Sequence, residues 1–263
     1  SNTGWLGRAM QASGLGGGVS ISIPMPLLLR GHPGSDTRYS TWLATPPPQL
    51  VEAVTRRWSA DPALAPYAEP VAAPYRGMDS AGMVPPQAQP FAQTRTPRAL
   101  AQAAGEAMRA NEGPMVGLVD LHGFDTHASQ GAAEGTHADR LAAVDQVLEG
   151  YREAIGERWR DCLVVTLTEF GRTVAENGTG GTDHGTGGAM LLAGGALRGG
   201  KVYGAWPGLA EAALFERRDL MPTSDVRAWA AHVMRGLYGF DRGLLQDKVF
   251  PGLEMGPDPH VIL

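Results

Sequence analysis

Two different periods of apolar and polar positions run through the second half of the chain. Residues 132–159 carry apolar side chains at 141, 144, 148, 151 and 155, a spacing that predicts a long amphipathic helix. The runs 114–121 and 161–168 are short and apolar, and the second is β-branched, which is typical of a strand buried on both faces. Strand, long helix and strand form a βαβ unit, so we expect a parallel sheet covered by helices.

Caps and turn residues mark further elements in this half. A threonine and a proline open a helix over 96–110, and Ser224 opens another that reaches about residue 238. The segment 189–193 is a third strand, and 201–203 forms a hairpin with it across the intervening glycines. The pattern therefore predicts an α/β fold.

The first half is less regular. It contains a short helix over 5–11, an alternating strand over 19–23 and an amphipathic helix over 49–58. Two prolines directly after the strand argue against a central place in a sheet. Residues 61–93 read as a long loop with short helical turns. We expect one domain over 1–263, with 1–95 loop-rich and 96–263 carrying the βαβ part.

Composition narrows the class of protein. The 36 glycines and 20 prolines make up about a fifth of the chain, against a norm of about 12%, without a collagen period, which excludes fibres and long bundles. A net charge of −5 and no basic stripe argue against nucleic acid as a partner. No apolar run approaches the roughly 18 residues of a membrane span. The single cysteine, Cys162, excludes an internal disulfide, and its apolar neighbours predict a buried thiol.

Metal-ligating side chains gather where the predicted strands end, which is where open parallel sheets bind ligands. Asp125 and His127 are two apart, so both project to one side of an extended segment. Asp183 and His184 are adjacent and converge only in a tight turn, which the surrounding glycines permit. Other polar residues of these loops are Asp120, His122, Glu169 and Arg172. Imidazole with carboxylate oxygens suits Zn, Mn, Mg, Ca or Fe, and the planar fork of the arginine suits phosphate or sulfate.

Plainer interpretations stay open for each residue. An Asp-X-His triplet occurs by chance, and Asp183–His184 is compatible with ordinary turn chemistry. Glu169 could cap a helix or pair with Arg172, which is then a structural ion pair. His122 could hydrogen-bond within its own loop. The sequon at Asn177 is common and carries no weight.

Three motifs resemble the bacterial domain-of-unknown-function 1501 family, which is sulfatase-like and grouped with the alkaline phosphatase superfamily. They are GFDTHASQ (123–130), TEFGRT (168–173) and the glycine-rich stretch 176–204. The resemblance implies a three-layer α/β/α sandwich with a mostly parallel sheet and a site for one or two divalent ions. Carried over by motif, the metal ligands are Asp125, His127, Asp183 and His184, and the catalytic residues are Glu169 and Arg172. In a second alignment, Glu169 faces the metal and His184 matches a later single histidine.

The chain departs from the family at its start. Family members begin with a strand that bears an Asp-containing turn, preceded by a twin-arginine export signal, and we expect both to be missing here. The resemblance thus implies a periplasmic or exported protein whose nucleophile lies in the absent segment. Thr126, Thr168 and Thr182 are candidates by position alone.

These inferences predict a hydrolase of phosphate or sulfate esters that uses Zn, Mn, Ca or Mg. Its substrate would be a small anionic ester or a sulfated or phosphorylated glycan. The alternative is a non-catalytic exported protein that binds such anions in the same pocket, and a third possibility is that the loops are only structural. Rings of His127 and His184 more than about 7 Å apart, with no shared carboxylate, would exclude a common ion.

Overall fold

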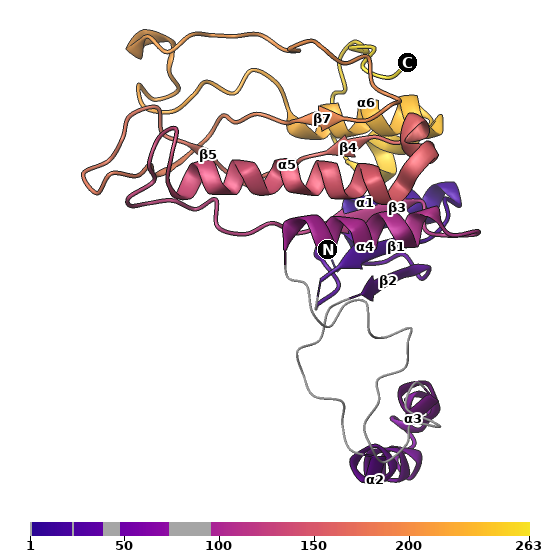
Figure 1. Ribbon diagram of the computed structural model, residues 1–263. Coiled ribbons are helices and arrows are strands. Elements are labelled where there is room, and N and C mark those ends of the chain that lie inside the picture. Colours follow the sequence, from indigo (N-terminus) through magenta and orange to yellow (C-terminus); the bar gives the residue numbers. More distant parts are fainter. Residues whose placement is uncertain (1, 23, 39–47, 74–95) are drawn as a thin grey trace. The chain divides into compact units, whose positions relative to one another are not determined.

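The computed structural model describes residues 2–22, 24–38, 48–73 and 96–263. They fall into two compact units, the larger formed by Ser1–Arg38 with Thr96–Leu263 and the smaller by Tyr39–Arg95. The fold is mixed α/β, with a small parallel sheet of three strands in the larger unit (Figure 1). Among the described residues, no helix has the length and apolar character needed to cross a membrane.

The elements follow one another along the chain with short strands and longer helices. The strands are β1 (Gly18–Ile21), β2 (Ser35–Arg38), β3 (Val116–Val119), β4 (Val164–Val165), β5 (Gly171–Arg172), β6 (His184–Gly185) and β7 (Leu192–Ala193). The α-helices are α1 (Trp5–Ser13), α2 (Pro48–Ser59), α3 (Ala65–Ala72), α4 (Pro97–Arg109), α5 (Thr136–Ile155) and α6 (Val226–Tyr238). Short helices are η1 (Leu27–Leu29), η3 (Gly156–Asp161), η4 (Glu211–Ala213) and the π-helix η5 (Leu244–Val249).

The strand that we expected at an edge is the centre of the sheet. β1 pairs in parallel with β2 on one side and with β3 on the other, and all four of its residues are buried. The prediction from Pro24 and Pro26 is wrong because both prolines follow Ile21, the last paired residue. Their missing N–H groups therefore remove nothing from the ladder.

Helices lie against both faces of this sheet. A Cβ at Gly117 would point at α4, 2.5 Å from Met108 Sδ. Gly117 is paired with Val19, so the neighbouring Gly18 faces the other way. A Cβ there would lie 3.3 Å from Met10 of α1 and 3.2 Å from Leu29 of η1. The missing side chains let the helices approach closely.

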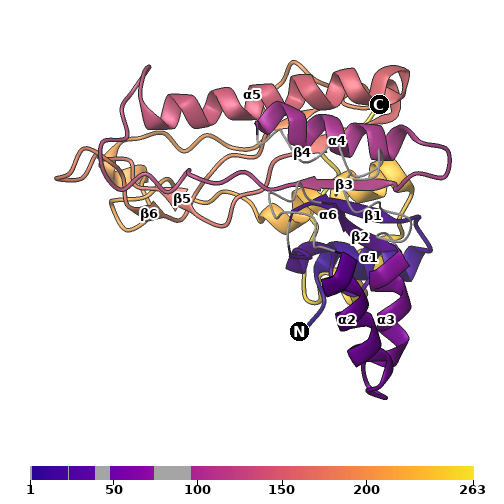
Figure 2. The same ribbon diagram turned by 60° about the horizontal axis from the view of Figure 1, so that its bottom comes forward.

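Caps set the helix starts as the sequence predicts. Thr96 caps α4, with its hydroxyl oxygen accepting from the Ala99 amide. α6 begins one residue later than expected, because Asp225 and not Ser224 accepts from the amide of Arg227. α5 is shorter than the predicted 132–159 helix; Ala143 and, toward the end of the helix, Gly150, Tyr151, Ala154 and Ile155 are buried, and α5 packs on α4. Figures 1 and 2 show α4 and α5 side by side.

Two clusters of buried apolar side chains hold the larger unit together. One joins α4 and α5 through Ala101, Tyr151 and Ile155. The other joins α1, α6 and η5, and its members include Ala9, Ala231, Met234, Leu245 and Val249. Cys162 is half-buried rather than buried, and its sulfur lies 3.5 Å from the Tyr151 hydroxyl.

The apolar run 161–168 is not a buried parallel strand. Within this run only β4 is a strand; it pairs antiparallel with β7 and is half-buried, and Leu167 is 44% exposed. The predicted βαβ unit is therefore wrong, since β4 lies outside the β2-β1-β3 sheet. An apolar run indicates that a segment is at least partly buried, but the strand with which it pairs depends on residues far along the chain. No strand is present at 201–203 in the described structure, where Val202 is fully exposed.

The described part of the smaller unit, residues 48–73, contains the helices α2 and α3. α2 begins at Pro48, as its amphipathic pattern predicts, and contacts α3. α3 contains Pro70 and lies within the stretch that the sequence assigned to a loop with helical turns. Residues 74–93 of that stretch lie outside the described residues.

Candidate metal centre

The polar residues of the site come from the 120–130 segment and from the β5–β6 ladder. After β3 the chain continues without regular structure through 120–130, which carries Asp125 and His127. His184 lies in β6, whose partner β5 places Arg172 opposite it. In Figures 1 and 2, β5 lies near the N-terminal end of α5. The site is thus built on loops and a two-residue antiparallel ladder, and not on the edge of one parallel sheet.

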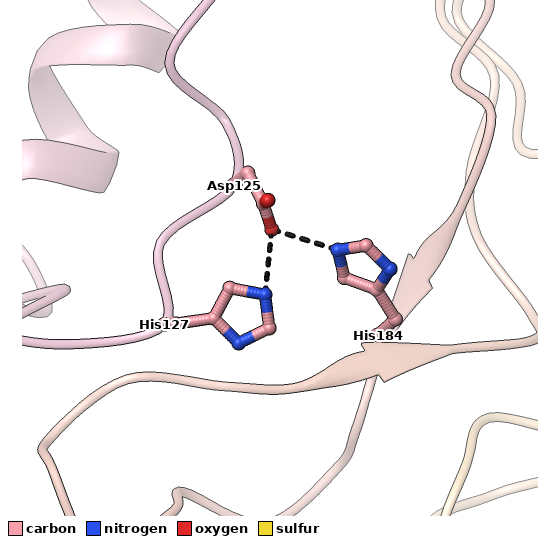
Figure 3. Close-up of side chains that lie close together, drawn as sticks. All are labelled: Asp125, His127 and His184. Carbon is pink, nitrogen blue, oxygen red and sulfur yellow. Dashed lines mark hydrogen bonds and ion pairs between the residues drawn. The ribbon is translucent and has the colours of Figure 1, made fainter.

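Asp125, His127 and His184 form the core of the site (Figure 3). The carboxylate oxygen Oδ1 of Asp125 lies 2.8 Å from Nε2 of His184 and 3.0 Å from Nε2 of His127. The two ring centroids are 5.0 Å apart. The rings therefore pass the distance test for a common ion, and they share a carboxylate. About half of each side chain is exposed, so the cluster is open to a ligand.

These three side chains fit a divalent ion. One ligand atom from each, two imidazole nitrogens and a carboxylate oxygen, lies within 4.8 Å of the other two. Tetrahedral zinc with ligands at 2.0–2.1 Å needs ligand atoms about 3.3 Å apart. The observed oxygen–nitrogen separations are a few tenths of an ångström shorter, so small side-chain rotations make room. Three protein ligands leave a fourth position for water or a substrate, as in catalytic zinc sites.

Asp183 lies on the other side of His127. Its Oδ1 is 3.2 Å from Nδ1 of that ring, while Nε2 faces Asp125. Asp183 is therefore brought to the site, but behind a ligand rather than beside the other ligand atoms. A carboxylate in this place orients an imidazole and fixes its tautomer.

Arg172 is used to hold the site together. Its Nη1 donates to the carbonyl of Thr182 at 2.8 Å, and its Nη2 donates to the carbonyl of Phe124 at 2.7 Å and to Asp125 at 2.6 Å. Only 20% of its side chain is exposed. Arg172 thus forms a structural ion pair with Asp125 and not with Glu169, and this pair joins the 120–130 segment to the β5–β6 ladder.

Phe170 escaped the sequence analysis. Its ring stacks on the His184 ring, with centroids 4.2 Å apart and planes 6° apart, and the Arg172 guanidinium lies 4.6 Å from its centroid. An aromatic residue between glutamate and glycine gives no periodic signal, so only the motif itself could have indicated it.

The other predicted residues are placed less centrally. Glu169 is exposed and, within the described structure, makes no hydrogen bond or ion pair. His122 is exposed and pairs with Asp120 at 3.5 Å. The hydroxyls of Thr126 and Thr182 are buried and both donate to Gln130, at 2.7 Å each. Thr168 donates to the carbonyl of Phe170. The three threonines proposed as nucleophiles therefore all have their protons engaged.

Electrostatics keep the site carboxylates ionised. The hydrogen bond from His184, and then that from Arg172, holds the pKa of Asp125 below its ordinary value. Hydrogen bonds from Asn177 and then His127 lower the pKa of Asp183. Both carboxylates are anionic at neutral pH, which is the state that a cation requires.

Glycines allow the 176–185 segment to reach the histidines. Gly180 has a φ of +71°, a conformation that favours glycine. Gly181 packs on the backbone of the other segment, where a Cβ would lie 2.3 Å from the carbonyl carbon of His127. The glycine excess of the composition thus has a local purpose here.

A family model described as protein of unknown function (DUF1501) matches residues 77–238. The match covers more than half of the 263 residues and includes Asp125, His127 and His184. No curated protein and no solved structure matches the chain.

Proposed function

The chain belongs to the DUF1501 family of proteins of unknown function, and we propose that it is a metal-dependent hydrolase of phosphate or sulfate esters. One observation supports this most: a single oxygen of Asp125 lies within 3.0 Å of Nε2 of both His127 and His184. Without a cation, two imidazole nitrogens that converge on one exposed oxygen gain little, since exposed ion pairs contribute under about 1 kcal/mol.

The donor set favours particular ions. Two imidazoles and one carboxylate suit Zn, Mn or Fe(II), whereas Ca and Mg prefer oxygen ligands throughout. When bound, such an ion polarises an ester oxygen and lowers the pKa of an attacking water or hydroxyl. Asp125 would contribute the negative charge, and His127 and His184 would bind through Nε2. Asp183 would hold His127 in place from Nδ1.

Arg172 and Glu169 would have different roles in the reaction. Arg172 keeps Asp125 and the carbonyls of Phe124 and Thr182 in register, so its part is positioning rather than direct contact with an anion. Glu169, exposed and unpaired in the described structure, is the carboxylate that is free to accept or deliver a proton.

We also propose a fold type and a cellular location for the chain. Three parallel strands with α4 on one face and α1 on the other are compatible with a three-layer α/β/α sandwich of the alkaline phosphatase type. We propose the same class of substrate as that superfamily, a small anionic ester or an anionic glycan, and a periplasmic or exported location.

One observation favours the rival, a protein that binds anionic glycans without cleaving them. The hydroxyls of Thr126, Thr168 and Thr182 all donate to protein acceptors, so none of them is free to attack. A bound ion would then serve recognition alone. Turnover distinguishes the two.

The test of the metal centre is metal content measured on purified protein. We expect about one Zn, Mn or Fe per chain, and lower occupancy in His127→Ala and His184→Ala. His122→Ala is the matched control, because His122 lies on the same segment and pairs only with Asp120. An ion at 100 times its Kd should also raise the free energy of unfolding by about 2.7 kcal/mol. Full occupancy in both site variants would refute the site.

The test of the reaction is hydrolysis of an aryl phosphate and an aryl sulfate, with each metal supplied in turn. Turnover that disappears with a chelator supports the hydrolase. Metal-dependent binding of these esters without turnover supports the glycan-binding alternative.

A further inference from the structure

The side chain of Asn177 connects most of the groups around His127. Its Nδ2 donates to the carbonyl of His127 and to Oδ1 of Asp183, both at 3.0 Å. Its Oδ1 accepts from the amides of Thr179 and Gly181, at 3.0 Å each, and from the Thr179 hydroxyl at 2.8 Å. Both protons and the oxygen of the amide are therefore engaged, although the residue is only half-buried.

The two halves of this amide have different tasks. The oxygen closes the turn of its own segment, 177–181, as asparagine does in many loops. The nitrogen reaches out of the turn to the backbone of His127, 50 positions earlier, and to the carboxylate behind the ring of His127. A residue needed only for the turn would require the oxygen alone.

We propose that Asn177 is a positioning residue of the metal centre, which holds Asp183 and the backbone of His127 so that the ring presents Nε2 to the ion. The inference rests on the proposed metal site. Asp183 contacts Nδ1 of His127 at 3.2 Å, and Asn177 fixes the oxygen that makes this contact. An ionised carboxylate at Nδ1 keeps the proton there, which leaves the lone pair of Nε2 for a cation.

This arrangement also explains the sequence Asn177-Gly178-Thr179. It matches a glycosylation sequon, but glycosylation would replace a proton on Nδ2, and both protons on that atom are hydrogen-bonded to the site. The hydroxyl of Thr179 instead shares its one proton between two acceptors, the carbonyl of His127 at 2.7 Å and Oδ1 of Asn177 at 2.8 Å.

Asn177→Asp separates the two tasks. An aspartate keeps an oxygen for the amides of Thr179 and Gly181, so the turn is retained. It loses both donors and places a second carboxylate about 3 Å from Asp183, where two like charges repel. Asn111→Asp is the matched control, because it makes the same charge change at an exposed position outside the site.

The experiment measures Zn affinity by competition with a chelator and, in the Zn-loaded protein, the solvent exchange of the His127 Nδ1 proton by NMR, on the full chain. We expect Asn177→Asp to bind Zn about 10–100-fold more weakly than wild type. In the Zn-loaded variant, the Nδ1 proton of His127 should lose the acceptor that Asn177 holds in place, and it should exchange faster than in wild type. Asn111→Asp should match wild type in both measurements.

The outcomes keep this inference apart from the metal site. If His127→Ala loses Zn but Asn177→Asp binds it within about twofold of wild type, the positioning role is overturned and the metal site stands. If wild type binds none of Zn, Mn and Fe(II), the metal site fails, and the positioning role that rests on it fails with it. Should Asn177→Asp not fold, Asp183→Asn removes the carboxylate that Asn177 holds and should weaken Zn binding by a similar factor; a Zn affinity within about twofold of wild type would overturn the role.

Discussion

Replacing Gly181 by alanine should open the candidate metal centre without changing any of the proposed ligand side chains. Gly181 is buried where the 176–185 segment crosses the backbone after His127. An added Cβ would lie 2.3 Å from the carbonyl carbon of His127 and 2.5 Å from the amide nitrogen of Ala128. Ordinary contacts of this kind begin near 3.5 Å, so the two segments must separate by about 1 Å. No rotation of a side chain relieves the clash, because both neighbours are backbone atoms.

The size of the effect follows from two opposing contributions. Inserting a methyl group into a tightly packed place costs about 1–3 kcal/mol. Removing a glycine from the unfolded chain returns about 0.4–1 kcal/mol. The net loss in the free energy of unfolding is therefore about 1–2 kcal/mol. If metal binding requires the closed arrangement, the same energy weakens the affinity for the ion about 5–30-fold.

The assay is urea unfolding in the presence of a chelator, followed by a metal titration of the same protein. Gly178→Ala is the matched control, because its Cβ meets open space and its φ is not left-handed. We expect that variant to keep the metal affinity and to gain up to about 1 kcal/mol of stability. Wild-type stability and affinity in Gly181→Ala would show that the two segments do not touch as described, and would refute the reasoning.

Two further predictions concern stability. Asp219 is 2% exposed and accepts from Arg218 at 2.7 Å and from Thr186 at 2.9 Å. Asp219→Asn should lower the free energy of unfolding by about 1–3 kcal/mol at neutral pH, because the amide N–H groups of the new asparagine would face these donors. The ion pair with Arg218 lowers the pKa of Asp219, so its contribution is present above about pH 4 and is lost as pH falls through the lowered folded-state pKa. The gap in urea midpoint between wild type and variant should therefore shrink in acid, and a constant gap would contradict this. Thr96→Ala removes the cap of α4 and should lower the free energy of unfolding by about 0.5–2 kcal/mol in the same assay, and an unchanged midpoint would show that the cap carries no energy.

Local signals predicted the elements of the fold better than their pairing. The cap at Thr96 and the strand predicted over 114–121 depend on neighbours in sequence, and the structure confirms the cap and a strand over 116–119; the last helix is also present, with Asp225 rather than Ser224 as its cap. The central place of β1 and the antiparallel pairing of β4 depend on residues far along the chain. An apolar run of six to eight residues cannot name its partner, so the predicted βαβ unit placed β4 in a sheet to which it does not belong.

The site was predicted by residue type, and its internal roles were not. The two-residue spacing of Asp125 and His127 does place both at the cluster, and the glycines do let His184 reach them. Spacing cannot tell which nitrogen of His127 faces which carboxylate, because Asp183, 56 positions later, decides it. Nor could the spacing show that the hydrogen bonds of the Arg172 guanidinium hold two loops together.

The candidate metal centre lies on segments that contain little regular structure, and this determines which interactions can hold it in place. β5 and β6 have two residues each, and 120–130 has no strand or helix. Backbone ladders cannot hold three ligands in place there, so side chains that bond to backbone must do so: Arg172 to the carbonyls of Phe124 and Thr182, and Asn177 to that of His127. Such residues have no period and no characteristic spacing. A site of this kind is therefore visible in a sequence through its proposed ligands, while the positioning roles of the residues that hold them appear only in the structure.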